Sequence, residues 1–185
     1  MDDSYAENKI RLRAPEPEDL ELLYTWENDQ NIWQVSNTLV PFSRHILKKY
    51  LDNAHLDIYQ AKQLRLMIDR GIGDDRQETV GAIDLFDFDP FHLRAGVGIL
   101  IYNDKNKNQG LATAALKELI SYAFSSLQLH QLYCNVASDN QASIRVFRKV
   151  GFEIVGTKKE WLKRPDGYTD EVLMQLITHN TMINS

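Results

Sequence analysis

The segment Asn108-Gln109-Gly110-Leu111-Ala112-Thr113 combines residue types that can hold a phosphate group. It opens a stretch in which apolar residues recur every three or four positions, the pattern of a buried helix. The first N–H groups of a helix have no partner within it, and the helix dipole places partial positive charge there. Gly110 permits close approach to the backbone, and Lys105 and Lys107 add cations. Alone, this pattern also fits an ordinary polar helix start, and the glycine fingerprints of dinucleotide and P-loop sites are absent.

Composition limits the partners that this loop can serve. The 26 acidic side chains exceed the 21 basic ones, for a net charge of −5, so nucleic acid is disfavoured and a cationic small molecule is favoured. A single cysteine, Cys134, excludes an internal disulfide framework. The acidic start and the lack of a long apolar run disfavour secretion and membrane insertion, so we expect a cytoplasmic protein.

The elements that position the loop follow from periodicity and turn residues. We expect flexible tails at residues 1–8 and 180–185 and one domain over 9–179. A strand at Ile10–Arg13 precedes a helix at Pro17–Asn28, an irregular aromatic connection at 31–42 and a helix that Ser43 caps. The further elements expected are strands at 63–69, 79–86 and 94–102, a helix from Leu111, a strand at 131–137, a helix at 139–151, and strands at 152–161 and 168–177.

Two motifs in this order resemble the GCN5-related N-acetyltransferase (GNAT) family. The first is Lys107-Asn108-Gln109-Gly110-Leu111-Ala112, where the family has Gln/Arg-x-x-Gly-x-Gly/Ala. The second runs from Asn140-Gln141-Ala142-Ser143 through Phe147 to Gly151-Phe152. The opening RLR, the long first helices and the final GY-x-D-x-x-x-M look most like spermidine and diamine N-acetyltransferases and the enzymes that acetylate protein N-termini. The resemblance implies an α/β (α+β) fold with a mixed sheet of about seven strands, a bulge in the fourth strand and helices on both faces.

The resemblance implies acetyl-CoA as cosubstrate and no metal. In relatives the fourth and fifth strands splay apart, and the pantetheine arm pairs with the fourth, here through backbone groups of Ile99, Leu100 and Ile101. We place the oxyanion donor at the Ile99 N–H. Asn140 and Ser143 match positions that bind the pantetheine arm, with helix capping as the alternative role. The full set expected on the cofactor side is Ile99, Leu100, Ile101, Lys107, Asn108, Gln109, Gly110, Leu111, Ala112, Thr113, Asn140, Ser143, Phe147 and Lys149.

Two departures from the family pattern bear on catalysis. Phe147 stands where many relatives have a tyrosine that protonates the leaving thiolate, and Tyr133, Tyr102, Tyr168 or water can take over that role. Gly96 stands where many relatives carry a glutamate that acts as base through water. We therefore expect the base at Asp84, with Asp87 as the alternative, because strand neighbours alternate faces and both cannot enter one pocket.

The acceptor side is expected at the first helix and its following loop. Glu27, Asp29 and Trp33 can form an acidic, aromatic wall for an ammonium group, together with Asp84 and Asp87, although core packing or solvent exposure is the more frequent role of any one such residue. Tyr168 matches an aromatic on the last hairpin that closes the acceptor site in relatives, so the expected catalytic set is Asp84, Ile99 and Tyr168. Cys134 is expected to be an inert buried residue.

These residues predict an acetyl-CoA-dependent N-acetyltransferase that transfers the acetyl group directly to a primary amine, with a polyamine or diamine favoured. The alternatives are a protein N-terminus or another small amine as acceptor, and an acyl-CoA-binding protein without activity. The expected partners are a small-molecule amine or a peptide N-terminus, with no nucleic acid and no membrane. The resemblance leaves a homo-oligomer open.

Overall fold

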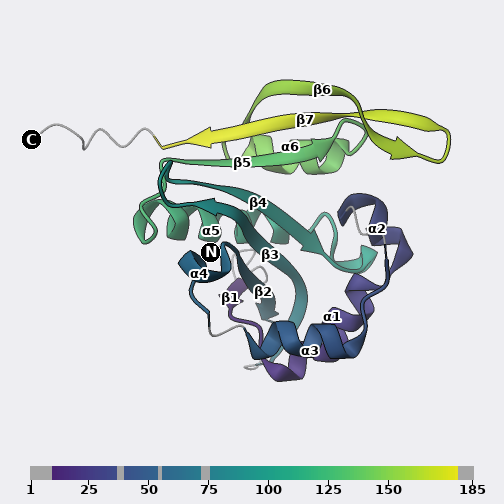
Figure 1. Ribbon diagram of the computed structural model, residues 1–185, viewed down its shortest axis with the longest axis vertical. Helices are drawn as coiled ribbons and strands as arrows, with labels where there is room; N and C mark the ends of the chain where they lie inside the picture. The colour runs from purple at the N-terminus through teal and green to yellow at the C-terminus, as the bar shows by residue number, and fades with distance from the viewer. Residues whose placement is uncertain (1–9, 37–39, 54–55, 72–75, 179–185) are drawn as a thin grey trace, which may run out of the picture.

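The computed structural model describes residues 10–36, 40–53, 56–71 and 76–178. The tails expected at 1–8 and 180–185 lie outside these residues. Seven strands form one mixed sheet in the order β1-β2-β3-β4-β5-β7-β6 (Figure 1). The strands are β1 (Ile10–Arg13), β2 (Leu64–Gly71), β3 (Gln77–Asp89), β4 (Arg94–Ile101), β5 (Gln131–Ala137), β6 (Glu153–Arg164) and β7 (Gly167–Ile177). All neighbours are antiparallel except β4 and β5.

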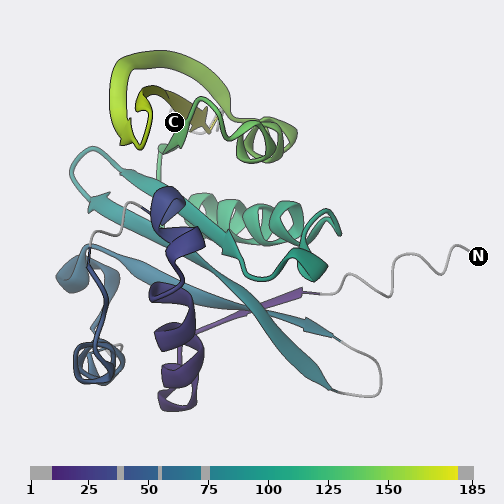
Figure 2. The same ribbon diagram turned by 90° about the vertical axis from the view of Figure 1, so that its right-hand side faces the viewer.

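Helices cover both faces of this sheet (Figure 2). Leu23 and Trp26 of α1 pack with Leu47 and Leu51 of α3 against Met67 and Ala82 on one face, and the larger core lies under α5 on the other. The helices are α1 (Leu20–Glu27), α2 (Gln30–Ser36), α3 (Arg44–Asp52), α4 (Ile58–Ala61), α5 (Leu111–Ser125) and α6 (Gln141–Lys149), with short 3-10 turns η2 (Pro17–Asp19) and η3 (Asp104–Asn106). Among the described residues no helix is long and apolar enough to cross a bilayer.

A buried ion-pair network fixes the entry into α1. Both η-nitrogens of Arg13 donate to the carboxylate of Asp19, at 2.7 and 2.8 Å, and its Nε donates to Asp69 on β2 at 2.7 Å. Burial works against the charged form of Asp19, but the bonds from Arg13 and from the Glu16 N–H outweigh it and lower the pKa of this carboxyl. The network therefore ties the start of α1, which ends at Glu27, to the sheet.

Two sequence expectations are corrected. The connection expected to be irregular over 31–42 contains helix α2, because Asp29 starts it: its side chain accepts from the Asn31 N–H at 2.9 Å, and its carbonyl accepts from Ile32 and Trp33. The bulge expected in the fourth strand lies on its partner instead. Between the pairs Phe86 with Gly96 and Asp89 with Arg94, β3 advances three residues while β4 advances two.

Candidate active site

Strands β4 and β5 separate after three residue pairs. Arg94, Ala95 and Gly96 pair with Gln131, Leu132 and Tyr133, and beyond Gly96 strand β4 keeps only its partner β3 (Figure 1). β5 continues alongside β7 instead. The edge of β4 that faces β5 is therefore open from Val97 to Ile101, where an extended ligand can pair as a strand does.

Strand alternation determines which backbone groups face this opening. The Tyr102 N–H donates to the Val80 carbonyl of β3 at 2.8 Å. Because backbone groups alternate sides along a strand, those of Leu100 also point to β3, while those of Ile99 and Ile101 point to the open edge. The geometry thus favours Ile99 and Ile101 as backbone partners for a ligand. It does not favour Leu100, which the sequence analysis also named, because the backbone groups of Leu100 point to β3.

The start of α5 lies just beyond this open edge in the chain. Its N-cap, Gly110, has φ 79° and makes no side-chain capping bond, and the first helical bond runs from the Ala114 N–H to the Gly110 carbonyl at 3.0 Å. The N–H groups of Leu111, Ala112 and Thr113 therefore precede the helical ladder. A Cβ built at Gly110 has no atom within 4 Å. This open, uncapped helix start fits the pyrophosphate of an acyl-CoA.

The lysines of the loop before α5 are paired with carboxylates. Lys107 donates to Asp104 at 2.7 Å and Lys105 donates to Glu78 at 3.0 Å, and these bonds help to lower the pKa of both carboxyl groups. Gln109 accepts from Arg70 at 2.7 Å. The two lysines are more than half exposed, so both ion pairs lie at the surface, where another anion can replace the carboxylate.

Side chains of α6 have roles of their own in the fold. Asn140 caps this helix, because its Oδ1 accepts from the Ser143 N–H at 3.1 Å. Phe147 is buried in the core and meets Phe152 edge to face, with 5.1 Å between ring centres. Lys149 is exposed in the last turn. The capping alternative is thus realised for Asn140, and Phe147 serves packing.

The expected acceptor residues Glu27 and Asp84 meet through Arg65. This arginine lies opposite Asp84 in the β2–β3 ladder and donates to it from Nε at 2.7 Å and Nη2 at 3.2 Å. Its Nη1 donates to Glu27 of α1 at 2.7 Å. Asp84 in turn pairs with Gly98, where a Cβ would lie 3.9 Å from the Asp84 Oδ2. One of the expected bases therefore lies next to the residue that precedes Ile99.

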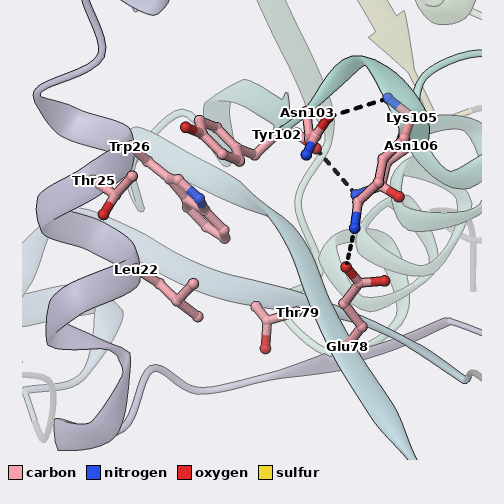
Figure 3. A pocket seen from close by; sticks show the side chains of 9 residues that line it. All are labelled: Leu22, Thr25, Trp26, Glu78, Thr79, Tyr102, Asn103, Lys105 and Asn106. Atoms are coloured by element: carbon pink, nitrogen blue, oxygen red, sulfur yellow. Dashed lines mark hydrogen bonds and ion pairs between the residues drawn. The ribbon is translucent and has the colours of Figure 1, made fainter.

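Trp33 and Asp29 complete the acceptor side at the corner between α1 and α2. The Trp33 indole donates to the Glu27 carbonyl at 2.8 Å. Burial and the neighbouring Asp29 raise the pKa of Tyr102, whose ring stacks on Trp26 with 5.5 Å between centres. Trp26 and Tyr102 also line a pocket of about 170 Å³, shown in Figure 3. The structure thus joins Glu27 and Asp84 through Arg65 and holds Trp33 on the Glu27 backbone, whereas the Asp29 side chain bonds to Asn31 and neighbours Tyr102.

Asp87 is held apart from this cluster by the bulge in β3. With φ 48° it interrupts the strand alternation, and its carboxylate accepts from the Tyr133 hydroxyl at 3.1 Å. Burial, followed by this hydrogen bond, raises the pKa of Tyr133 to about 12. Tyr133 therefore keeps its proton near neutral pH, and its role as a replacement acid stays a prediction.

Tyr168 lies near the tip of the β6–β7 hairpin, opposite Lys163, and is 64% exposed. The hairpin tip and α2 lie at the same end of the molecule (Figures 1 and 2). Among the described residues, no hydrogen bond or ion pair joins Tyr168 to Asp84 or Ile99. Its catalytic role remains a prediction.

The Phe86 ring explains why residue 96 is glycine. A Cβ at Gly96 would lie 2.3 Å from the Phe86 Cε2, and the same ring meets Tyr133 edge to face. Phe86 thus fills the volume that a glutamate at this position would need. Neither Phe86 nor Arg65 was predicted from the sequence. Phe86 lies two residues after Asp84, and Arg65 lies two residues before Met67, so the alternation of side chains along each strand places both on the α1 side of the sheet.

We expect Gly96→Ala to destabilise the fold by about 1–3 kcal/mol, because the added methyl group overpacks against a ring that is held on its other side. In a Phe86→Ala background the same change should cost less than about 0.5 kcal/mol, since the obstacle is gone. Urea unfolding of the four chains measures both values. Equal costs in the two backgrounds would contradict the assignment.

Cys134 is buried, and burial raises the pKa of its thiol to about 12. At about pH 8 only on the order of one thiol in 10⁴ is then ionised, so we expect a thiol reagent to modify the native chain at least about 100-fold more slowly than the urea-unfolded chain. Absorbance on reaction with an aromatic disulfide measures both rates. Fast modification of the folded protein would show that Cys134 is accessible.

Asp89 and His92 serve the turn between β3 and β4. The Asp89 carboxylate accepts from the backbone N–H groups of His92 and Phe91. Its pKa is lowered to about 2, chiefly by the hydrogen bonds from His92. Across the described part of the chain, no three His, Cys, Asp or Glu side chains form a group that could hold a metal ion.

A mixed sheet that opens between its parallel strands β4 and β5, followed by the uncapped start of α5, is the arrangement that the resemblance to the GNAT family implies. The Acetyltransferase (GNAT) domain family matches residues 9–153, so the chain belongs to the GNAT acetyltransferase family and is an N-acetyltransferase. The family and the fold predicted from the sequence are thereby confirmed.

Several proteins in this family resemble the chain over most or part of its length. Spermidine N(1)-acetyltransferase of Escherichia coli K12 is 27% identical over 149 residues, 80% of this chain and 75% of the relative. L-amino acid N-acetyltransferase of E. coli is 35% identical over 80 residues, 43% of this chain and 49% of the relative. The crystal structure of spermidine N-acetyltransferase from Vibrio cholerae with CoA and spermine superimposes with a TM-score of 0.78 at 23% identity, covering 91% of this chain and 95% of that one.

Proposed function

We propose that this protein transfers the acetyl group of acetyl-CoA directly to a primary amine of a small, polyamine-like acceptor. The observation that carries the proposal is the pair of carboxylates that Arg65 joins, Glu27 and Asp84, with Asp84 beside Gly98 where β4 has left β5. An ammonium group is attracted by such carboxylates and by the face of an aromatic ring such as Trp33. The relatives named for spermidine acetylation support the same acceptor class.

The cosubstrate supplies an acetyl thioester. The chain supplies groups that bind the cosubstrate at its pyrophosphate, along its pantetheine arm and at its thioester. The N–H groups of Leu111 to Thr113 bind the pyrophosphate, and the open edge at Ile99 and Ile101 pairs with the pantetheine arm. The Ile99 N–H donates to the thioester oxygen and stabilises the negative charge that develops there. Asn108, Gln109 and the exposed Lys107 border this side.

The acceptor arrives as an ammonium ion with a pKa of about 10 and loses a proton before it can attack. Asp84 accepts that proton, directly or through water, and the free amine nitrogen bonds to the carbonyl carbon. The nitrogen then loses a second proton to water as the tetrahedral intermediate collapses and the C–S bond breaks. The sulfur leaves as a thiolate with a pKa of about 8.5, which is stable enough near neutral pH to need no protein acid. Phe147 in place of an acid tyrosine is compatible with this route.

A panel of acceptors tests the proposal by release of free thiol from acetyl-CoA. The panel contains spermidine, putrescine, butylamine, an aminoglycoside, a free amino acid and a peptide with a free N-terminus. We expect the polyamines to give the highest kcat/KM. Highest activity on the peptide or the amino acid would transfer the assignment to that acceptor class, and thiol release with none of the amines would refute amine acetylation.

A further inference from the structure

Arg65 connects helix α1 to the sheet through its side chain. It projects from β2 and binds Asp84 on β3 through two nitrogens, while its third nitrogen binds Glu27 on α1. The three side chains are between 21% and 27% exposed, so the cluster is largely shielded from water. A planar guanidinium that makes several such bonds fixes the orientation of both carboxylates, which a lysine ammonium cannot do.

The charges around Arg65 come from three elements. Glu27 of α1 and Asp84 of β3 are the carboxylates, and Tyr50 of α3 places its ring 5.7 Å from the guanidinium carbon. Burial opposes the charge on Arg65, but Asp84 and Glu27 outweigh it and raise its pKa above the usual value. Burial raises the pKa of Tyr50; Arg65 works against this and the two carboxylates add to it, and Tyr50 stays neutral. Two carboxylates and one guanidinium therefore leave the cluster with one net negative charge.

We propose that Arg65 is a positioning and specificity residue, which holds the Asp84 carboxylate beside Gly98 and limits the negative charge that the acceptor meets. This inference rests on the proposed amine acetylation. Without the guanidinium, two neighbouring carboxylates would attract a multiply charged acceptor more strongly, but Asp84 would lose its fixed orientation and would take up a proton more readily. Arg65 thus favours turnover over tight binding of polycations.

The test compares Arg65→Met and Arg65→Lys with the unchanged chain, using the best amine that the chain accepts. We expect Arg65→Met to lower kcat by about 10–100-fold, because small displacements of a reacting group have effects of that size. KM for spermidine should fall by about threefold or more while KM for butylamine changes little, and the acidic limb of the kcat/KM profile should move to higher pH. Arg65→Lys keeps the charge but not the fork, so its acidic limb should stay in place while kcat recovers only in part.

Arg44→Met is the matched control. Arg44 also binds one carboxylate through two nitrogens, because its Nε and Nη2 each donate to Glu21 at 2.9 Å. Its guanidinium carbon lies 3.7 Å from the centre of the Tyr24 ring. It is exposed and joins α3 to α1 without reaching the sheet. We expect this change to leave kcat, the ratio of the two KM values and the pH profile as they are.

The outcomes separate this inference from the proposed function. If the unchanged chain acetylates amines but Arg65→Met retains its kcat, its pH profile and its KM ratio, the inference is wrong and the function stands. If Arg65→Met does not fold, Arg65→Lys decides: a wild-type kcat in that variant would overturn the positioning role. If the unchanged chain acetylates no amine, the proposed function fails first.

Discussion

Asp84→Asn is expected to lower kcat/KM for amine acetylation by about 10²–10⁴-fold, the usual range for loss of a general base. The amide keeps the shape of the side chain and one acceptor for Arg65, but it cannot take a proton from the ammonium group. Binding of acetyl-CoA should persist, because Asp84 lies on β3 and the cosubstrate is expected along the other edge of β4. Thiol release measures the first effect and the shift in melting temperature on adding acetyl-CoA measures the second.

Asp57→Asn is a suitable control for this change. Asp57 caps α4, where its side chain accepts from the Gln60 N–H at 2.9 Å, and asparagine caps a helix equally well. We expect full activity in the control. An Asp84→Asn variant with kcat/KM within about threefold of the unchanged chain would show that the base lies elsewhere, with Asp87 or water as the next candidate.

Gly110→Asp is expected to weaken acetyl-CoA binding by about 10²-fold or more. The new carboxylate would lie in the open space before the α5 donors, where two phosphate groups are expected. At an effective dielectric constant of about 20, like charges roughly 5 Å apart repel by about 3 kcal/mol, or about two powers of ten in affinity. The fold itself should survive, because aspartate tolerates left-handed backbone better than most residues and is favoured at a helix start.

Gly110→Asn separates charge from shape in this prediction. Asparagine has nearly the same size and backbone preferences as aspartate but carries no charge. We expect its KM for acetyl-CoA to lie much closer to that of the unchanged chain, with similar melting temperatures for both variants without ligand. Equal loss of binding in the two would point to steric blocking, and no loss in either would refute the phosphate site at this helix.

The features that the sequence predicts best are those with strong local signals. Helix α5 and the loop before it follow from periodicity and from Gly110, and the two motifs fix the order of β4, α5, β5 and α6. The short helix α2 escaped prediction because its start depends on Asp29, whose side chain accepts from the Asn31 N–H and whose backbone carbonyl accepts from Ile32 and Trp33. The bulge at Asp87 escaped because no glycine marks it.

Only some residues of the proposed acceptor site can be predicted from the sequence, for a related reason. Glu27 and Asp84 can be proposed from their residue types and positions, but Arg65 joins them only because of its register opposite Asp84. Likewise, the sequence alone indicates only that Gly96 replaces a glutamate of many relatives. The structure adds that the Phe86 ring occupies the space next to this glycine. Partners across strands depend on register, which a single sequence specifies weakly when several strands share similar apolar patterns.

The most direct test of the account is product analysis after incubating the unchanged chain with acetyl-CoA and spermidine. We predict one free thiol released for each spermidine that gains one acetyl group on a primary nitrogen, as seen by mass spectrometry alongside the thiol assay. Omitting spermidine should reduce thiol release to slow hydrolysis. Release of thiol without an acetylated amine, or no release although acetyl-CoA raises the melting temperature, would contradict the assignment of an amine acetyltransferase acting on polyamine-like acceptors.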